Sequence, residues 1–220
     1  PCDTGLSKIK RKKEHKIGDL YMALTMNKKV LTEAFGASEG ALLWLKQILL
    51  VVAGVMALAI AAKVKIPMTP VPITLGTLAV LTIGSAYGPR LGLATILGYL
   101  IIGALGFDVF ATSSASNSGL DYMVGGTGGY LVGYVVATLA LGKLARMGWD
   151  RTAPKMACAM LLGNLLIYIP GLIWLGALYG WDQPILQWGL TPFIFGDLVK
   201  LAVAAMLLPL AWKVIGKTRS

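Results

Sequence analysis

The chain has 220 residues, of which 56% are hydrophobic and only 14% are charged, whereas an ordinary soluble domain has about 25% charged residues. The hydrophobic residues lie in long blocks rather than at helical or alternating spacing. The composition therefore excludes an ordinary soluble domain and predicts an all-α integral membrane protein. The formal net charge is +10, but many positive residues precede the first apolar block, which favours an anionic membrane surface over nucleic acid as their partner.

The first 41 residues form a basic segment, which is predicted to be a partly disordered cytoplasmic tail. The single histidine, His15, lies in this tail, and the two cysteines, Cys2 and Cys158, are far apart in the sequence. This arrangement predicts neither a metal site nor a disulfide. The positive residues of the tail are Lys8, Lys10, Arg11, Lys12, Lys13, Lys16, Lys28 and Lys29.

The first predicted transmembrane helix covers residues 42–62, which are apolar apart from Lys46 and Gln47 near its start. A helix of this length extends about 31 Å, which is enough to cross the hydrocarbon core of a bilayer. Residues 65–72 follow as a predicted outer loop, because the three prolines in this segment cannot sustain a helix.

Two shorter apolar runs, residues 73–87 and 91–107, are separated by Gly88-Pro89-Arg90. A Gly-Pro pair interrupts a helix, so these runs predict the second and third helices. The polar residues 108–121 come next. Irregular backbone is not stable in contact with lipid, so this stretch must lie outside the hydrocarbon or line a cavity.

Three further apolar runs predict the fourth, fifth and sixth helices, at residues 126–145, 156–179 and 192–212. Six transmembrane helices are the simplest count. They form a predicted membrane domain over residues 42–215, and a short basic cytoplasmic tail, residues 216–220, follows it.

The distribution of lysine and arginine predicts that both termini lie in the cytoplasm. In this orientation the basic tail and the basic loop between the fourth and fifth helices face inward. Residues 108–121 and 181–183, which contain no lysine or arginine, face outward. Lys63 and Lys65 are the exception, because they fall in the first outer loop. The chain is therefore predicted to be a multi-pass protein of the bacterial cytoplasmic membrane.

Asp197 and Lys200 are the only acid and base deep within an apolar run, and their spacing places both on one face of the sixth helix. An ionisable group at the bilayer centre costs at least about 2.5 kcal/mol, so the pair indicates a functional site. The alternative is a structural ion pair that fixes helix packing. The pair is predicted to lie in the outer half of the membrane, where it suits an external solute that needs both an acceptor and a cationic donor.

Small and polar residues of other helices are further candidates. Gly125, Gly129 and Gly133 recur every four residues, which allows close approach of another helix or of a ligand. Tyr130 offers an aromatic ring and a hydroxyl to a heterocyclic ligand. Asn164 is either an interhelical hydrogen-bonding group or a ligand contact.

Alanines recur every four residues in the first helix, at Ala53, Ala57 and Ala61. Small residues at this spacing predict close packing, either within the fold or against a separate subunit. A Ser-His-Asp arrangement would need a histidine outside the tail, and the sequence contains none. An enzyme is therefore not expected.

Three motifs, taken together and in this order, resemble the BioY family, the substrate-binding subunits (S components) of energy-coupling-factor (ECF) biotin transporters. The resemblance covers residues 42–215. The motifs are Thr69-Pro70-Val71-Pro72-Ile73-Thr74-Leu75, then Gly126-Thr127-Gly128-Gly129-Tyr130-Leu131, and Pro192-Phe193 with Gly196-Asp197-Leu198-Val199-Lys200.

The resemblance implies a six-helix S-component fold that holds one biotin near the outer face, beneath the first and third outer loops. It implies that the aspartate and lysine of the sixth helix bind this ligand and that the Gly-Gly-Tyr segment contributes to the site. With the candidates above, the predicted ligand-binding residues are Asp197, Lys200, Tyr130, Gly128, Gly129, Asn164 and Thr74.

The resemblance also implies partners. The stripe of Ala53, Ala57 and Ala61 would dock on a transmembrane coupling protein, and two ATP-binding-cassette (ABC) ATPases would supply energy. Biotin is then a substrate, and no cofactor is expected.

Two departures from the family pattern are Gly126, where many relatives have proline, and Gly76, where glutamine is frequent. The sequence leaves open whether the chain works alone, as a homodimer or with these partners. An alternative function is a self-sufficient ion-coupled carrier for biotin or a similar small anionic vitamin.

Overall fold

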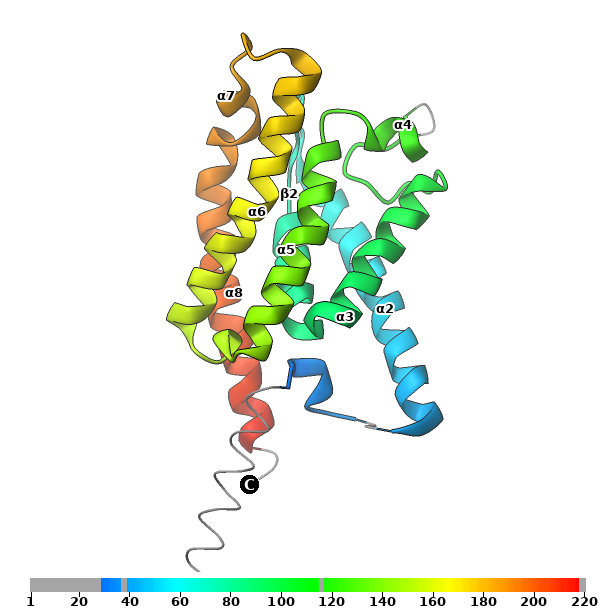
Figure 1. Ribbon diagram of the computed structural model, residues 1–220, viewed down its shortest axis with the longest axis vertical. Helices are drawn as coiled ribbons and strands as arrows, with labels where there is room; N and C mark the ends of the chain where they lie inside the picture. The colour runs from blue at the N-terminus through cyan, green and yellow to red at the C-terminus, as the bar shows by residue number, and fades with distance from the viewer. Residues whose placement is uncertain (1–28, 37–38, 115–116, 218–220) are drawn as a thin grey trace, which may run out of the picture.

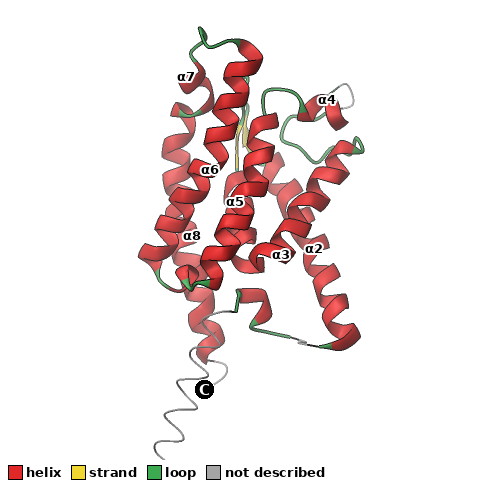
Figure 2. Ribbon diagram, viewed as in Figure 1, coloured by secondary structure: helices red, strands yellow, loops and turns green. Residues whose placement is uncertain are grey.

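The computed structural model of the protein describes residues 29–36, 39–114 and 117–217 (Figure 1). These residues are mainly helical, with a short two-stranded hairpin (Figure 2). The elements, in chain order, are η1 (Leu31–Glu33), α2 (Gly40–Lys63), β1 (Lys65–Ile66), β2 (Ile73–Thr74), α3 (Gly76–Ala104), α4 (Gly119–Met123), α5 (Gly128–Arg146), η2 (Trp149–Arg151), α6 (Ala153–Tyr179), α7 (Ile185–Gly189) and α8 (Thr191–Lys217).

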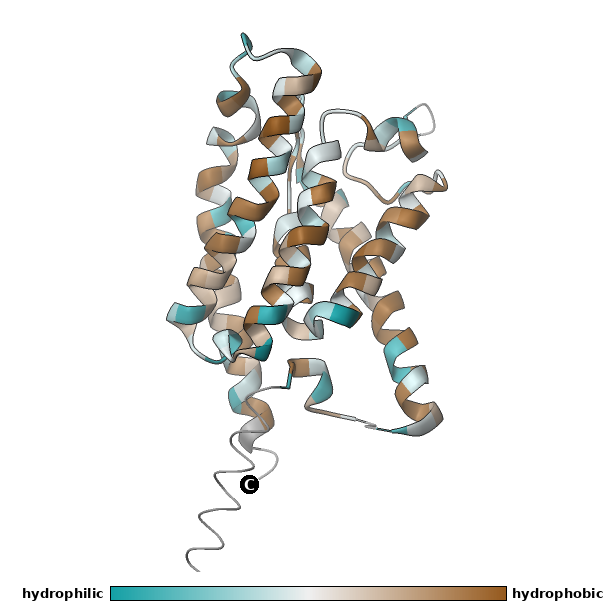
Figure 3. Cartoon of the chain, in the orientation of Figure 1, coloured by the Kyte–Doolittle hydropathy of each residue, from teal (hydrophilic) through white to brown (hydrophobic). Residues whose placement is uncertain are grey.

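Four helical stretches are long and apolar enough to cross a membrane: Gly40–Lys63, Gly128–Arg146, Ala153–Tyr179 and Ile185–Ile215. The first three agree within a few residues with the first, fourth and fifth predicted helices, and the last contains the sixth, predicted over residues 192–212, but begins seven residues earlier. Figure 3 shows these helices coloured mostly brown, the hydrophobic end of the scale. Large apolar side chains such as Trp44 are exposed along α2, which suits a helix in contact with lipid.

Helix α3 consists of two helical segments that meet at Gly88, as the Gly-Pro sequence predicts. The backbone of Gly88 has φ 78° and ψ 179°, outside the helical region, and glycine adopts such a positive φ without steric cost. A Cβ atom on Gly92 would lie 3.5 Å from the Cα of Gly84, although eight residues of straight helix would separate them by about 12 Å. The second segment therefore folds back beside the first.

The boundaries of α3 differ from the prediction at both ends. Ile73 and Thr74 do not begin the helix, because they pair with Ile66 and Lys65 as an antiparallel hairpin. At the other end the helix stops at Ala104 rather than at residue 107. Gly106 follows with φ 94°, the left-handed conformation that commonly ends a helix.

The long helices pack against one another in chain order, with α5 between α3 and α6 (Figure 1). Helices α5 and α6 approach closely at the predicted glycine stripe. A Cβ atom on Gly129 would lie 2.3 Å from the carbonyl oxygen of Pro170, and one on Gly133 would lie 2.6 Å from the Cα of Ile167. The stripe at Gly129 and Gly133 is therefore a helix-to-helix contact.

The end of the bundle near η1 is closed by the segment 29–36. Val30 and Thr32 are buried, and the Thr32 hydroxyl donates a hydrogen bond to the carbonyl oxygen of Ala86. Glu33 forms an ion pair with Arg146 at 2.6 Å. This part of the predicted tail thus packs on the bundle. Residues 1–28 and 218–220 of the two predicted tails lie outside the described residues.

Candidate functional site

A cavity lies between the β1–β2 hairpin, α2, α3, α4, α5, α6 and α8. The space open to the centre of a water molecule is about 60 Å³, or room for roughly four to six waters. Its polar lining comes from Thr74, Thr77, Thr127 and Lys200, among other groups. Its aromatic lining is Tyr99, Phe110, Tyr122, Tyr130, Tyr134, Tyr168 and Phe193.

Asp197 and Lys200 form an ion pair beside this cavity. The Lys200 Nζ lies 2.9 Å from Asp197 Oδ1, and their side chains are only 11% and 8% exposed. Breaking such a buried pair leaves an uncompensated charge, which costs about 3 to 5 kcal/mol. Lys200 lines the cavity, whereas Asp197 lies directly behind its hydrogen-bonding partners.

Two residues of other helices complete the hydrogen bonding of Asp197. The Tyr168 hydroxyl donates to Asp197 Oδ2. The Thr77 hydroxyl accepts a hydrogen bond from Lys200 Nζ at 3.1 Å and donates one to Asp197 Oδ1 at 3.4 Å. Asp197 therefore accepts three hydrogen bonds of the four or so that a carboxylate can accept, and Lys200 uses two of its three donors. With respect to the residues that the structure describes, one acceptor position of Asp197 and one donor of Lys200 remain.

Tyr130, one of the predicted ligand-binding residues, lines the cavity. Its ring meets that of Tyr168 edge to face, with 6.0 Å between centroids. Its hydroxyl donates to the carbonyl oxygen of Gly189 at 2.8 Å. The Tyr130 hydroxyl thus connects α5 to α7.

The structure does not bring the glycines before Tyr130 into the cavity lining. A Cβ atom on Gly128 would lie 2.3 Å from the carbonyl oxygen of Met123, and Gly129 contacts α6. Both glycines position Tyr130 by allowing this close packing. Thr74 does line the cavity, and its hydroxyl accepts a hydrogen bond from the backbone N–H of Gly76 at 3.0 Å.

Asn164 lies on the other side of Lys200, away from the aromatic cavity. It shares a small second cavity with Thr77 and Lys200, in which the space open to water centres is about 10 Å³. Its Oδ1 atom is buried and has no hydrogen-bond partner among the residues that the structure describes. A buried polar atom without a partner costs about 1 to 3 kcal/mol.

Thr77, Tyr134 and Tyr168 were not predicted as site residues from the sequence. The spacing of Tyr130 and Tyr134, one helical turn apart, was an available signal, because it places two tyrosines on one face of α5. Thr77 gave no local signal. It meets Asp197, 120 residues later, only through the packing of α3 on α8.

Two contacts connect the end of α2 and the segment after it to the segment between α3 and α4. Lys63 forms an ion pair with Asp108 at 2.5 Å, and Lys65 donates to the carbonyl oxygen of Ala111. Phe110, which is buried, stacks on Tyr122 of α4 with 4.8 Å between centroids. The hydrogen bond from Lys63, with another from Ser113, holds the pKa of Asp108 below its usual range.

The predicted docking stripe is open to its surroundings. Ala53 and Ala57 are exposed and Ala61 is partly exposed on α2. Gly54 and Leu58, each one residue after a stripe alanine and so about 100° round the helix from it, are buried. The stripe therefore does not serve the packing of α2 within the fold, which is the first of the two alternatives that the sequence leaves open.

Comparison with known proteins agrees with these observations. A family model described as the BioY family matches residues 26–217. The "Probable biotin transporter BioY" of Pyrococcus horikoshii is 35% identical over 162 residues, which cover 74% of this chain and 93% of that protein. The "Biotin transporter BioY" of Thermotoga maritima is 31% identical over 150 residues, 68% of this chain and 86% of that protein.

The fold is also similar to that of a solved structure, the "S-component for biotin from an ECF-type ABC transporter". The TM-score is 0.64 at 19% sequence identity, and the match covers 80% of this chain and 95% of that one. The likeness supports the arrangement of helices described above. From the family match over residues 26–217 and the identity to these relatives, the chain belongs to the BioY family and is a multi-pass membrane protein.

Proposed function

We propose that this protein captures biotin with high affinity from outside the cell and carries it inward as the S component of an ECF-type ABC transporter. The observation that supports this most strongly is the buried Asp197–Lys200 pair beside an aromatic cavity, in a chain of the BioY family. Relatives with this family name are biotin transporters. The protein is a transport subunit rather than an enzyme.

The hydrogen bonds left open at the site match the ureido group of biotin. Lys200 has one N–H to offer the ureido oxygen, and Asp197 has one acceptor position for a ureido N–H. The Thr77 hydroxyl makes the longest contact to Asp197, 3.4 Å, so it is the weakest of the three hydrogen bonds that hold the carboxylate. Tyr130, Tyr168 and Phe193 supply apolar faces for the fused rings.

The volume of the cavity indicates that the loops above it move when biotin binds. About 60 Å³ of space for water centres is too small for a bicyclic ligand with a five-carbon acid chain. The segments that close the cavity are joined by the exposed Lys63–Asp108 ion pair, and such a pair contributes only about 0.2 to 1 kcal/mol. We propose that these segments open to admit biotin.

We further propose six membrane crossings, with both termini in the cytoplasm. The two segments of α3 would be the second and third crossings, since the second folds back at Gly88. The cavity then opens outward, and the basic end near Arg146 faces the anionic cytoplasmic leaflet.

Labelling of single cysteines, in a variant without Cys2 and Cys158, tests this orientation. Asp182→Cys should react with an impermeant maleimide in intact cells, whereas Lys155→Cys should react only after permeabilisation.

The partners proposed for transport are a transmembrane coupling protein and two ABC ATPases. The exposed stripe of Ala53, Ala57 and Ala61 is the surface proposed for docking on the coupling protein. A homodimer that uses the same stripe is the competing arrangement. Native mass spectrometry of the gently purified complex distinguishes the two through the masses of the subunits that remain bound.

The alternative function is a self-sufficient ion-coupled carrier, in which Asp197 and Lys200 relay protons. Biotin uptake by cells decides between the two. The proposed function predicts that uptake persists when an uncoupler removes the proton gradient while cellular ATP is held constant. It also predicts that uptake stops when ATP is depleted. Uptake that collapses with the uncoupler alone would favour the carrier.

A further inference from the structure

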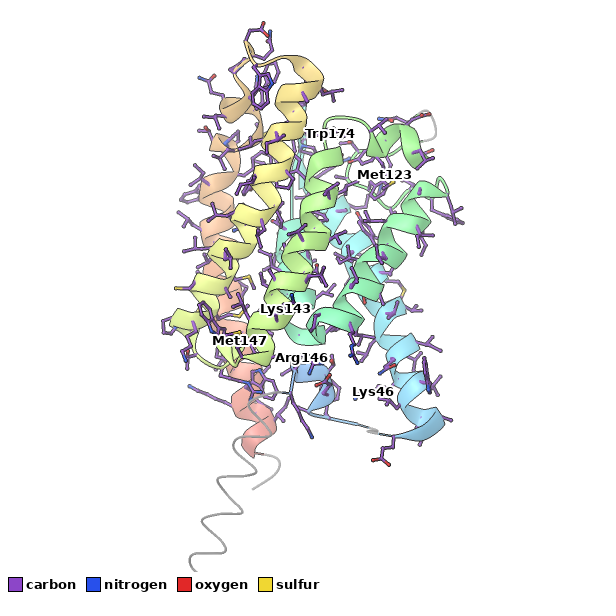
Figure 4. The ribbon with its side chains drawn as sticks, in the orientation of Figure 1. Lys46, Met123, Lys143, Arg146, Met147 and Trp174 are labelled. Atoms are coloured by element: carbon purple, nitrogen blue, oxygen red, sulfur yellow. The ribbon has the colours of Figure 1, made fainter. Side chains whose placement is uncertain are left out.

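A third, larger cavity lies at the end of the bundle near η1, remote from the aromatic cavity. It is enclosed by the segment 29–36, α2, the bend of α3 and the end of α5, and the space open to water centres is about 630 Å³. Figure 4 shows Lys46 on α2 and Arg146 on α5 at two sides of this region. The biotin function proposed above uses none of its residues.

The walls of this cavity carry a marked excess of positive charge. Four cationic side chains line it, Lys29, Lys46, Arg90 and Arg146, against a single carboxylate, Glu33. Glu33 already forms an ion pair with Arg146 at 2.6 Å. Arg90 is exposed and, in the part of the chain that the structure describes, forms no ion pair. The cavity is therefore suited to an anion, and a planar guanidinium is suited to phosphate in particular.

One wall of the same cavity is apolar. Leu43 and Leu50 of α2 face Leu91 and Ala94 of α3 across it. On its other side α2 presents exposed apolar residues, which in a membrane protein are in contact with lipid. A small soluble anion would not contact the apolar wall. An amphipathic anion would contact the cationic side chains and the apolar wall together.

We propose that this cavity binds an anionic phospholipid of the cytoplasmic leaflet. Its phosphate headgroup contacts Arg90, Lys29 and Lys46, and one acyl chain lies along Leu43 and Leu50. Basic pockets between transmembrane helices at the cytoplasmic side are suited to anionic headgroups, because this leaflet is rich in them. The apolar wall and the lipid-facing position of α2 favour a lipid over an acidic segment of a protein partner.

Native mass spectrometry of the full chain in detergent provides the test, with phosphatidylglycerol and phosphatidylcholine of identical acyl chains as probes. The parent should bind phosphatidylglycerol more tightly than phosphatidylcholine. Arg90→Gln and, separately, Lys29→Gln should each weaken phosphatidylglycerol binding by about fivefold, the effect of removing one cation near an anionic headgroup. Lys143→Gln is the matched control, because Lys143 is exposed at the same end of α5 but does not line the cavity.

Three outcomes would overturn the proposal: equal binding of the two lipids, equal effects of Arg90→Gln and Lys143→Gln, or displacement of phosphatidylglycerol by inorganic phosphate at equal concentration. The last would show a site for a free anion rather than for a lipid. Thermal unfolding of each variant confirms that it is folded, and two separate cavity variants guard against misfolding of either one. Biotin binding is measured in parallel, so a failure of this proposal is distinguishable from a failure of the biotin function.

Discussion

At the scale of single residues, the site depends on how Asp197 is held. Three donors from three different elements converge on its carboxylate, namely Thr77 of α3, Tyr168 of α6 and Lys200 of α8. A carboxylate held in this way is oriented before the ligand arrives, which reduces the ordering cost of binding. The partners of Asp197 are therefore expected to affect biotin affinity even where they do not contact the ligand.

Tyr168→Phe tests this expectation. The substitution removes the hydroxyl that donates to Asp197 Oδ2 and leaves the aromatic ring in place. A hydrogen bond to a charged group contributes about 1.5 to 3 kcal/mol, so biotin affinity should fall by at least about tenfold. Equilibrium binding of radiolabelled biotin measures the effect. Tyr87→Phe, which removes a hydroxyl at the opposite end of the bundle, is the control, and equal affinities for the two variants would contradict the account.

Asn164→Leu tests the role of the buried amide beside Lys200. Since Asn164 Oδ1 has no partner among the described residues, its removal should stabilise the protein by about 1 kcal/mol. If the Asn164 amide positions Lys200 at the biotin site, the same variant should bind biotin more weakly. Thermal unfolding and biotin binding, measured on one preparation, should thus change in opposite directions. A variant that is more stable and binds biotin as tightly as the parent would restrict Asn164 to a structural role.

The features that could be predicted from the sequence are the local ones. The spacing of Asp197 and Lys200 by itself predicts that they share a helix face, and the structure places their charged atoms 2.9 Å apart. Whether Thr77 and Tyr168 contact Asp197 depends on which helices become neighbours, and the spacing of residues along one helix does not predict this. For the same reason the glycine stripe could not be assigned in advance, because a bare helix face accepts another helix or a ligand equally well.

At the scale of elements, the loops above the cavity are the parts expected to move. The Lys63–Asp108 ion pair and the hydrogen bond from Lys65 to Ala111 connect the segment after α2 to the segment after α3. Both connections lie at the surface, so they contribute little to overall stability. Their effect should therefore be larger on the rates of biotin binding and release than on affinity.

Lys63→Gln removes the ion pair and should accelerate both association and dissociation of biotin, while affinity changes by less than about fivefold. Because the pKa of Asp108 is lowered by Lys63, the pair is intact above the ordinary pKa of aspartate and is lost as the pH falls through the lowered value. The rates of the parent should thus approach those of the variant in acid. Surface plasmon resonance over a pH series measures these rates, with Lys155→Gln as control. Identical dissociation rates for parent and variant at neutral pH would contradict the expectation.

The break of α3 could be predicted from Gly88-Pro89, since both residues act on the local backbone. The β1–β2 hairpin could not, because the pairing of Lys65 with Thr74 depends on a turn that brings distant residues together. Burial of the segment 29–36 was likewise not predicted. The Thr32 hydroxyl donates to the carbonyl oxygen of Ala86, 54 residues away, and a segment of eight residues is too short for a periodic pattern to predict such a contact.

At the scale of the whole molecule, the proposed function separates capture from transport. The residues proposed to bind biotin lie inside the bundle, whereas Ala53, Ala57 and Ala61 lie on its surface. A change at the stripe should therefore leave binding intact and abolish uptake. A self-sufficient carrier has no such separation, unless its own oligomer uses the same surface.

Ala57→Leu tests this separation. The larger side chain prevents close approach of a second helix at the stripe, so the complex with the coupling protein should be lost. Co-purification of the partner subunits and uptake of radiolabelled biotin should both fall to background, with biotin affinity within about twofold of the parent. Ala57→Ser keeps a small side chain and should behave as the parent does. Normal uptake by Ala57→Leu would show that docking uses another surface.

The most direct test of the central claim is calorimetric titration of the purified protein with biotin, in parallel for the parent, Asp197→Asn and Lys200→Ala. The account predicts tight, one-to-one binding by the parent. Each variant should lose at least about a hundredfold in affinity, because the remaining buried charge is left without its partner. Thermal unfolding confirms that the variants are folded. No binding by the parent, or unchanged binding by both folded variants, would contradict the assignment of this buried pair as the biotin site.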